Sequence, residues 1–170
     1  MAKGNFSISS VNIPLLAGSV ILSYLAGFIG SLFTETGTGS WYQTVLVKPW
    51  FTPPGIVFPV VWNILYLLMG ISLYLLLSGN LADRRVRILT GVFGIQLVLN
   101  ALWSILFFGL KSPVSGLICI IILWSAILYL IVYSWNFNRK VSYLLIPYIV
   151  WVTIATAINA AVVILNPGLL

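Results

Sequence analysis

The sequence predicts an all-α integral membrane protein, folded as a bundle of five transmembrane helices. Hydrophobic residues make up 61% of the 170-residue chain and charged residues only 6%, whereas soluble domains carry roughly 25% charged residues. The charges are confined to short stretches, which leaves long uncharged runs at residues 4–34, 49–82, 88–110, 112–138 and 141–170. Each run exceeds the ~20 residues that a helix needs to cross a bilayer. Helices are favoured over a β-barrel because the runs are continuously apolar, whereas barrel strands would alternate in polarity.

The predicted helices lie within one membrane domain that covers residues 1–170. They span approximately residues 11–33, 55–78, 87–110, 114–135 and 141–164. Small residues at three- and four-residue spacing in the first helix, such as Gly27 and Gly30, allow a neighbouring helix to approach closely. Pro113 separates the third helix from the fourth, and the fifth contains Pro147 and stops near Asn166.

A loop at residues 34–54 joins the first two helices, and we call it the lid. Glycines, threonines and prolines bracket an aromatic segment that includes Trp41, Tyr42, Lys48 and Trp50. A long loop in so small a protein is often functional, for example as a cover over a binding site. The alternative is that its tryptophans only anchor the chain at the membrane interface.

The residues required for acid–base or metal chemistry are nearly absent. The chain has no histidine, its only acidic residues are Glu35 and Asp83, and its single cysteine is Cys119. A histidine metal site, a Ser-His-Asp triad and a paired-carboxylate glycosidase are therefore excluded. No metal and no required cofactor are expected.

The net charge of +6 is explained by membrane orientation, so no nucleic-acid partner is expected. With five spans, one side of the membrane receives Lys3, Arg84, Arg85, Arg87, Arg139 and Lys140, and the other receives only Lys48 and Lys111. Because cytoplasmic loops carry an excess of Lys and Arg, we expect the N-terminus to be cytoplasmic.

Three of the predicted helices carry stripes of aromatic or amide residues. At 100° per residue, one side of the third predicted helix presents Gln96, Asn100, Trp103 and Phe107. One side of the second predicted helix presents Phe58, Trp62, Tyr66 and Met69. One side of the fifth predicted helix presents Pro147, Trp151 and Ala155, with Tyr148 and Asn159 at its edge. Amides in hydrocarbon must be paired, so the stripes should face the bundle interior.

Two interpretations of these stripes remain open. The converging stripes would enclose a pocket for a large, planar, mostly apolar ligand, held by stacking and a few hydrogen bonds. Lys48, at the mouth of that pocket, would meet a ligand carboxylate. In the other interpretation, the amides only bridge helices and the tryptophans only fill volume. On nearly the opposite side of the third helix, Gly91 and Gly94 offer a surface for homodimer formation, or for packing inside the bundle.

At these residues the chain resembles the TspO/translocator protein family, the tryptophan-rich sensory proteins also called peripheral-type benzodiazepine receptors. The resemblance covers essentially the whole chain. It rests on the order and spacing of Trp41-Tyr42, Lys48-Pro49, Phe51-Thr52-Pro53-Pro54, Phe58, Val61-Trp62, Leu65-Tyr66, Met69-Gly70, Gln96-Leu97, Asn100, Trp103, Pro147-Tyr148, Trp151, Ala155 and Ile158-Asn159.

The resemblance implies a five-helix bundle, often dimeric, that binds porphyrins and isoquinoline-type drugs beneath the first loop. Family ligand contacts map onto Pro53, Phe58, Trp62, Tyr66, Asn100, Trp103, Trp151 and Ala155; Gln96 joins this set through the stripe analysis. Trp62 and Trp151 match the tryptophans linked to light-dependent porphyrin breakdown. The sterol motif of animal relatives is missing after Asn159, where no Tyr, Arg or Lys follows.

Three functions follow as hypotheses. The first is a membrane sensor or regulator that binds a tetrapyrrole, protoporphyrin or haem. The second is light-dependent porphyrin degradation, an enzyme-like activity in which Trp62 and Trp151 are the reactive side chains. The third is transport of lipids or tetrapyrroles, although no internal repeat typical of transporters is apparent. Tetrapyrroles and membrane lipids are the expected partners, and the short chain suggests a prokaryotic cell membrane.

Overall fold

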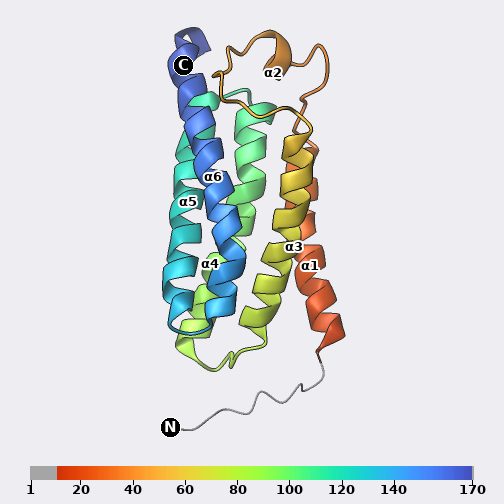
Figure 1. The fold of residues 1–170 in the computed structure, drawn as a ribbon, viewed down its shortest axis with the longest axis vertical. Helices are drawn as coiled ribbons and strands as arrows, with labels where there is room; N and C mark the ends of the chain where they lie inside the picture. Colours follow the sequence, from red (N-terminus) through yellow and green to blue (C-terminus); the bar gives the residue numbers. More distant parts are fainter. Residues whose placement is uncertain (1–10, 170) are drawn as a thin grey trace.

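The computed structural model describes residues 11–169, and five long helices run along its length (Figure 1). The long helices are α1 (Ile13–Ser31), α3 (Val57–Leu77), α4 (Arg84–Ser104), α5 (Pro113–Trp135) and α6 (Arg139–Leu165). The shorter elements are α2 (Trp41–Thr44), the π-helix η1 (Ile105–Gly109), which continues α4, and the 3₁₀-helix η2 (Pro167–Leu169). Each long helix, with η1 counted as part of α4, is long and apolar enough to cross a membrane. The predicted all-α, five-helix fold class is confirmed.

The outer surface of the bundle is as apolar as its interior. Only 22% to 33% of the most apolar window of each helix is buried inside the molecule, although every window is strongly hydrophobic. Side chains such as Ile21, Ile64 and Val98 therefore point away from the bundle with more than half of their surface exposed. A surface of this kind is stable only against hydrocarbon. The chain is an integral membrane protein.

Polar side chains fix where four of the long helices begin. Each accepts a hydrogen bond from a backbone N–H of the first turn; they are Asn12 for α1, Asp83 for α4, Ser112 for α5 and Asn138 for α6. Because Asp83 caps α4, this helix begins at Arg84, three residues before the predicted start at residue 87. Arg84 and Arg85 therefore lie in the helix and not in the connection before it.

The five long helices form a closed ring. Going round it, α1 packs on α3, α3 on α6, α6 on α5, α5 on α4, and α4 back on α1, while α3 also contacts α4 across the centre. Met69, Phe93, Ile127 and Tyr148 are fully buried in the resulting core. The three helices with aromatic and amide stripes, α3, α4 and α6, thus share the interior.

The contact between α1 and α3 depends on Gly70. A Cβ atom at this position would lie 2.6 Å from the Cα of Val20 and 2.8 Å from its Cγ2. Gly27 on α1 likewise leaves room for the ring of Tyr66, which a Cβ would overlap. The small residues of the first helix therefore pack within the bundle, as their spacing predicts.

We expect Gly70→Ala to destabilise the bundle by about 1–3 kcal/mol, because the methyl group has to push the backbone of α1 away. Thermal unfolding in detergent, followed by circular dichroism, measures this effect. The matched control is Gly18→Ala on α1, where a Cβ would have no atom within 4 Å. Equal melting temperatures for the two variants would contradict the close approach of α1 and α3.

Candidate functional site

The aromatic stripes of α3 and α6 meet in the middle of the bundle. The ring centroids of Phe58 and Trp151 lie 5.6 Å apart, and the ring planes cross at 70°. Trp62 approaches Tyr148 edge-on, with centroids 6.1 Å apart, and stacks on Tyr66 of its own helix at 5.4 Å. Both geometries are favourable for aromatic pairs. The two stripes therefore form one continuous aromatic cluster.

A chain of hydrogen bonds links this cluster to the amides of α4. The Tyr66 hydroxyl donates to Asn100 Oδ1 at 2.9 Å, and Asn100 Nδ2 donates to the Tyr148 hydroxyl at 3.1 Å. The Tyr148 hydroxyl in turn donates to Gln96 Oε1 at 3.0 Å. Because no water can satisfy these groups inside a bilayer, their mutual pairing fixes α3, α4 and α6 in one register. The predicted convergence of the three stripes is therefore present in the structure.

Two buried donors beside this chain lack a hydrogen-bond partner among the described residues. They are Gln96 Nε2, on the last residue of this series of hydrogen bonds, and Trp151 Nε1, one turn beyond Tyr148 on α6. An unpaired buried donor costs about 1–3 kcal/mol. Both groups would gain free energy from a ligand that carries hydrogen-bond acceptors.

The remaining predicted ligand residues are Trp103, Ala155 and Pro53. Trp103 Nε1 donates to Asn159 Oδ1 at 3.1 Å, and the Trp103 ring stacks on Phe107 at 5.6 Å. Ala155 is buried on α6, and Pro53 is half-buried in the segment before α3. The structure therefore groups Phe58, Trp62, Tyr66, Gln96, Asn100 and Trp151 closely, with Trp103 in an adjoining cluster.

The lid packs on the π-helix η1. Trp41 contacts Phe107 edge-on, with ring centroids 6.0 Å apart, and Tyr42 contacts Phe108 at 5.5 Å. Leu46 is 5% exposed and joins the same apolar cluster as Phe107. π-helical turns are rare, and many of those known lie at functional sites. Here the wider turn presents two adjacent phenyl rings to the short helix α2. The sequence analysis predicted neither the π-helix nor α2.

Lys48 and the tryptophans of the lid have distinct surroundings. Lys48 Nζ donates to the Tyr42 carbonyl oxygen and to Gln43 Oε1, both at 3.0 Å, so its ammonium group is bound within the lid. Burial raises the pKa of the Tyr42 phenol above its ordinary value. Trp50 is 95% exposed, as an interfacial anchor would be, whereas Trp41 packs inward.

Asn166 fastens the lid to the end of α6, a role that the sequence did not reveal. Its side chain pairs with both backbone groups of Val47: the Val47 N–H donates to Asn166 Oδ1, and Asn166 Nδ2 donates to the Val47 carbonyl, each at 2.9 Å. Because the residue precedes Pro167 and Gly168, the sequence predicts only that a helix ends there. Its partner lies 119 residues away, and no local pattern marks the pair.

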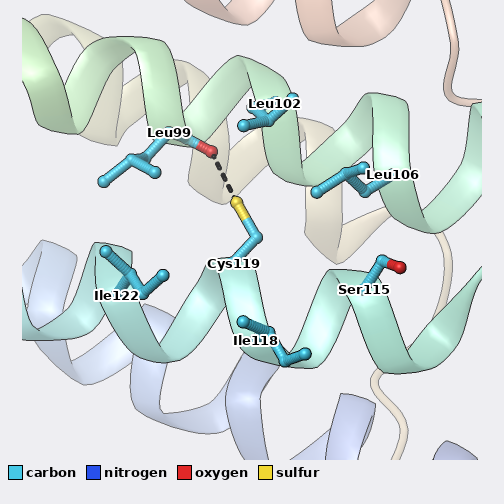
Figure 2. Close-up of a pocket in the computed structure, with 7 residues that line it drawn as sticks. All are labelled: Leu99, Leu102, Leu106, Ser115, Ile118, Cys119 and Ile122. Carbon is cyan, nitrogen blue, oxygen red and sulfur yellow. Dashed lines mark hydrogen bonds between the residues drawn. The ribbon is translucent and has the colours of Figure 1, made fainter.

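Two grooves on the outer surface contain none of the predicted ligand residues. A groove of about 290 Å³ between α4 and α5 is lined by Leu99, Leu102, Leu106, Ser115, Ile118, Cys119 and Ile122 (Figure 2). Another, of about 370 Å³, lies between α5 and α6 and includes Trp124 and Thr153. Both are almost entirely apolar; in the first, the Cys119 thiol donates to the Leu99 carbonyl at 3.5 Å. Their chemistry suits lipid chains rather than a ligand that needs hydrogen bonds.

We expect Asn166→Ala to loosen the lid, because it removes both side-chain hydrogen bonds to Val47, of about 1 kcal/mol each. Hydrogen exchange at the Val47 amide and across residues 34–54 should accelerate about 5- to 30-fold. Asn63→Ala is the matched control, since its exposed side chain only donates to Pro59 within its own helix. Unchanged lid exchange in the Asn166 variant would show that the lid is held elsewhere.

Comparison with known proteins agrees with this architecture. The model of the TspO/MBR family matches residues 19–165. The chain is 44% identical over 157 residues to the tryptophan-rich protein TspO of Archaeoglobus fulgidus. That alignment covers 92% of this chain and 99% of the relative. It is 40% identical to the protein of the same name in Chlorobaculum tepidum, over 89% of this chain and 96% of the relative. The tryptophan-rich sensory protein of Cereibacter sphaeroides is 34% identical, over 74% and 77% respectively. The chain therefore belongs to the TspO/MBR family.

Proposed function

We propose that this protein is a membrane sensor or regulator that binds a tetrapyrrole, such as protoporphyrin or haem, in the aromatic cluster beneath the lid. The observation that carries the proposal is the pairing of flat aromatic surfaces with two buried donors that lack a partner among the described residues, Gln96 Nε2 and Trp151 Nε1. The name of the relative in Cereibacter sphaeroides, a sensory protein, supports the regulatory half of the proposal.

The chemistry of the site favours this ligand class. A tetrapyrrole has a large planar π-face, which stacks on Trp62 and Trp151, and nitrogen or carboxylate acceptors for the two donors. Isoquinoline-type drugs with a carbonyl group share both features at smaller size. Because Phe58 contacts Trp151 directly, a ligand has to separate these rings to enter. The lid covers that end of the bundle and would open at the same time.

Titration of protoporphyrin into the protein in lipid nanodiscs tests the proposal. The absorption of the porphyrin is the readout, so that removing tryptophans does not change the signal. We expect the double variant Trp62→Ala/Trp151→Ala to weaken binding at least about tenfold, which corresponds to about 1.4 kcal/mol of lost stacking and hydrogen bonding. Trp151→Phe, which keeps the ring but removes the donor, should show a smaller loss.

Trp124→Ala is the control, because Trp124 lies at the outer groove and donates to Thr153. Circular dichroism checks that every variant retains its helices. An affinity of the double variant equal to that of the original protein would refute binding at this site.

Light-dependent porphyrin degradation is the second candidate function. It is favoured by the stacking of Trp62 on Tyr66, with centroids 5.4 Å apart and ring planes at 22°, because two oxidisable rings in contact can share an unpaired electron. Illumination of the same nanodiscs in air distinguishes the two functions. Faster bleaching than in protein-free nanodiscs, slowed in the double variant at equal occupancy, supports degradation; equal bleaching leaves binding alone.

A homodimer through α4 is also part of the proposal. Gly91 and Gly94 are exposed on the outer face of this helix, and a Cβ at either position would have no atom within 4 Å in the single chain. We expect Gly91→Cys, in a Cys119→Ser background, to form disulfide-linked dimers in native membranes. Gly18→Cys on α1 serves as the control. Equal crosslinking at the two positions would argue against this interface.

A further inference from the structure

Two helices of this bundle carry cations in their first turn, although α4 also has the acidic cap Asp83. Arg84, Arg85 and Arg87 occupy the first residues of α4, and Arg139 and Lys140 open α6. Neither helix has an acidic residue in its first turn. The partial positive charge of a helix N-terminus repels cations and attracts anions. Both helix starts therefore present a positive field that an external anion would relieve.

The two helix starts lie at the same end of the molecule. Figure 1 shows the beginnings of α4 and α6 together at the end opposite the lid. The connections that precede them also touch, because a Cβ at Gly79 would lie 3.1 Å from the ring of Phe137. Five cations from two distant parts of the sequence thus form one surface, which we call the cationic end.

The charge balance of this end is unlike that of the lid end. Asp83 is the only acidic residue among the described residues of the cationic end, and its carboxylate already caps α4 through the Arg85 N–H at 2.8 Å. At the lid end, the described residues include two lysines, Lys48 and Lys111, and Glu35. The positive charge is therefore concentrated on one side of the membrane.

Exposed aromatic residues set the depth of this surface in the bilayer. Tyr133, Trp135 and Tyr143 are between 37% and 58% exposed, and they lie at the end of α5 and the beginning of α6. Trp135 packs against Tyr143 at 5.2 Å, and the Arg139 guanidinium lies 5.6 Å from the Trp135 ring. Tyrosine and tryptophan on a lipid-facing surface mark the level of the headgroups. Arg139 and Lys140 therefore lie beside residues of the kind that mark the headgroup level.

From this geometry we propose that the cationic end binds the phosphate headgroups of anionic phospholipids. Arg84, Arg85, Arg139 and Lys140 are exposed and supply the positive charge. Arg87 donates to the carbonyl oxygens of Leu81 and Ala82, which holds the connection between α3 and α4 in place. Clusters of four to eight cations next to a membrane span attract anionic lipids strongly. This binding is independent of the tetrapyrrole site.

Lipid retention in mixed micelles tests the proposal. The purified protein is equilibrated with equal amounts of phosphatidylcholine and phosphatidylglycerol, and the lipids that remain after gel filtration are quantified by mass spectrometry. We expect phosphatidylglycerol to be enriched at least about threefold, given the attraction of each cation to an anionic surface. The quadruple variant Arg84→Gln/Arg85→Gln/Arg139→Gln/Lys140→Gln should lose this enrichment, and high salt should weaken it.

Lys111→Gln at the opposite end is the control and should retain the enrichment. If the quadruple variant does not fold, Arg84→Gln/Arg85→Gln alone should lower the enrichment partially. Equal enrichment in the folded variant and the original protein would overturn the proposal. The proposal would also be overturned if added inorganic phosphate abolished the enrichment and sodium chloride of equal ionic strength did not. That result would assign the site to a free anion.

Discussion

The structure depends on one constraint, that polar groups inside a bilayer must find partners within the protein. Tyr66, Asn100, Tyr148 and Gln96 meet it together, through three consecutive hydrogen bonds between 2.9 and 3.1 Å. Apolar side chains pack about equally well when two helices are shifted along each other, so apolar packing selects the alignment of the helices only weakly. An amide in hydrocarbon loses its hydrogen-bond partners when the helices are misaligned. The chain of hydrogen bonds therefore selects the alignment of α3, α4 and α6, and with it the position of every aromatic ring nearby.

The lid adds a second layer to this arrangement. Its short helix α2 places Trp41 and Tyr42 on the phenyl rings of η1, and Asn166 holds Val47 from the end of α6. Both contacts lie at one end of the bundle and share no residue with the central hydrogen bonds. The lid and the central polar chain are therefore held by separate sets of interactions.

The spans and the inward stripes were predictable because hydrophobicity and helical periodicity are local properties of the sequence. The start of α4 was misplaced by three residues because the charges of Arg84 and Arg85 suggested a loop, although Asp83 is a strong cap. Asn166 and the binding of Lys48 within the lid depend on partners brought together only by folding. Tyr148 was assigned to the edge of its stripe, yet it lies at the centre of the polar chain because both neighbouring amides point toward it.

We propose that the aromatic and amide residues of α3, α4 and α6 form a binding site for a tetrapyrrole. A structure of the protein in lipid with protoporphyrin bound would locate the ligand directly. We expect the macrocycle to lie between Trp62 and Trp151, with an acceptor atom within hydrogen-bonding distance of Trp151 Nε1 or Gln96 Nε2. A macrocycle seated in the outer groove beside Cys119, with the Phe58–Trp151 contact intact, would contradict it.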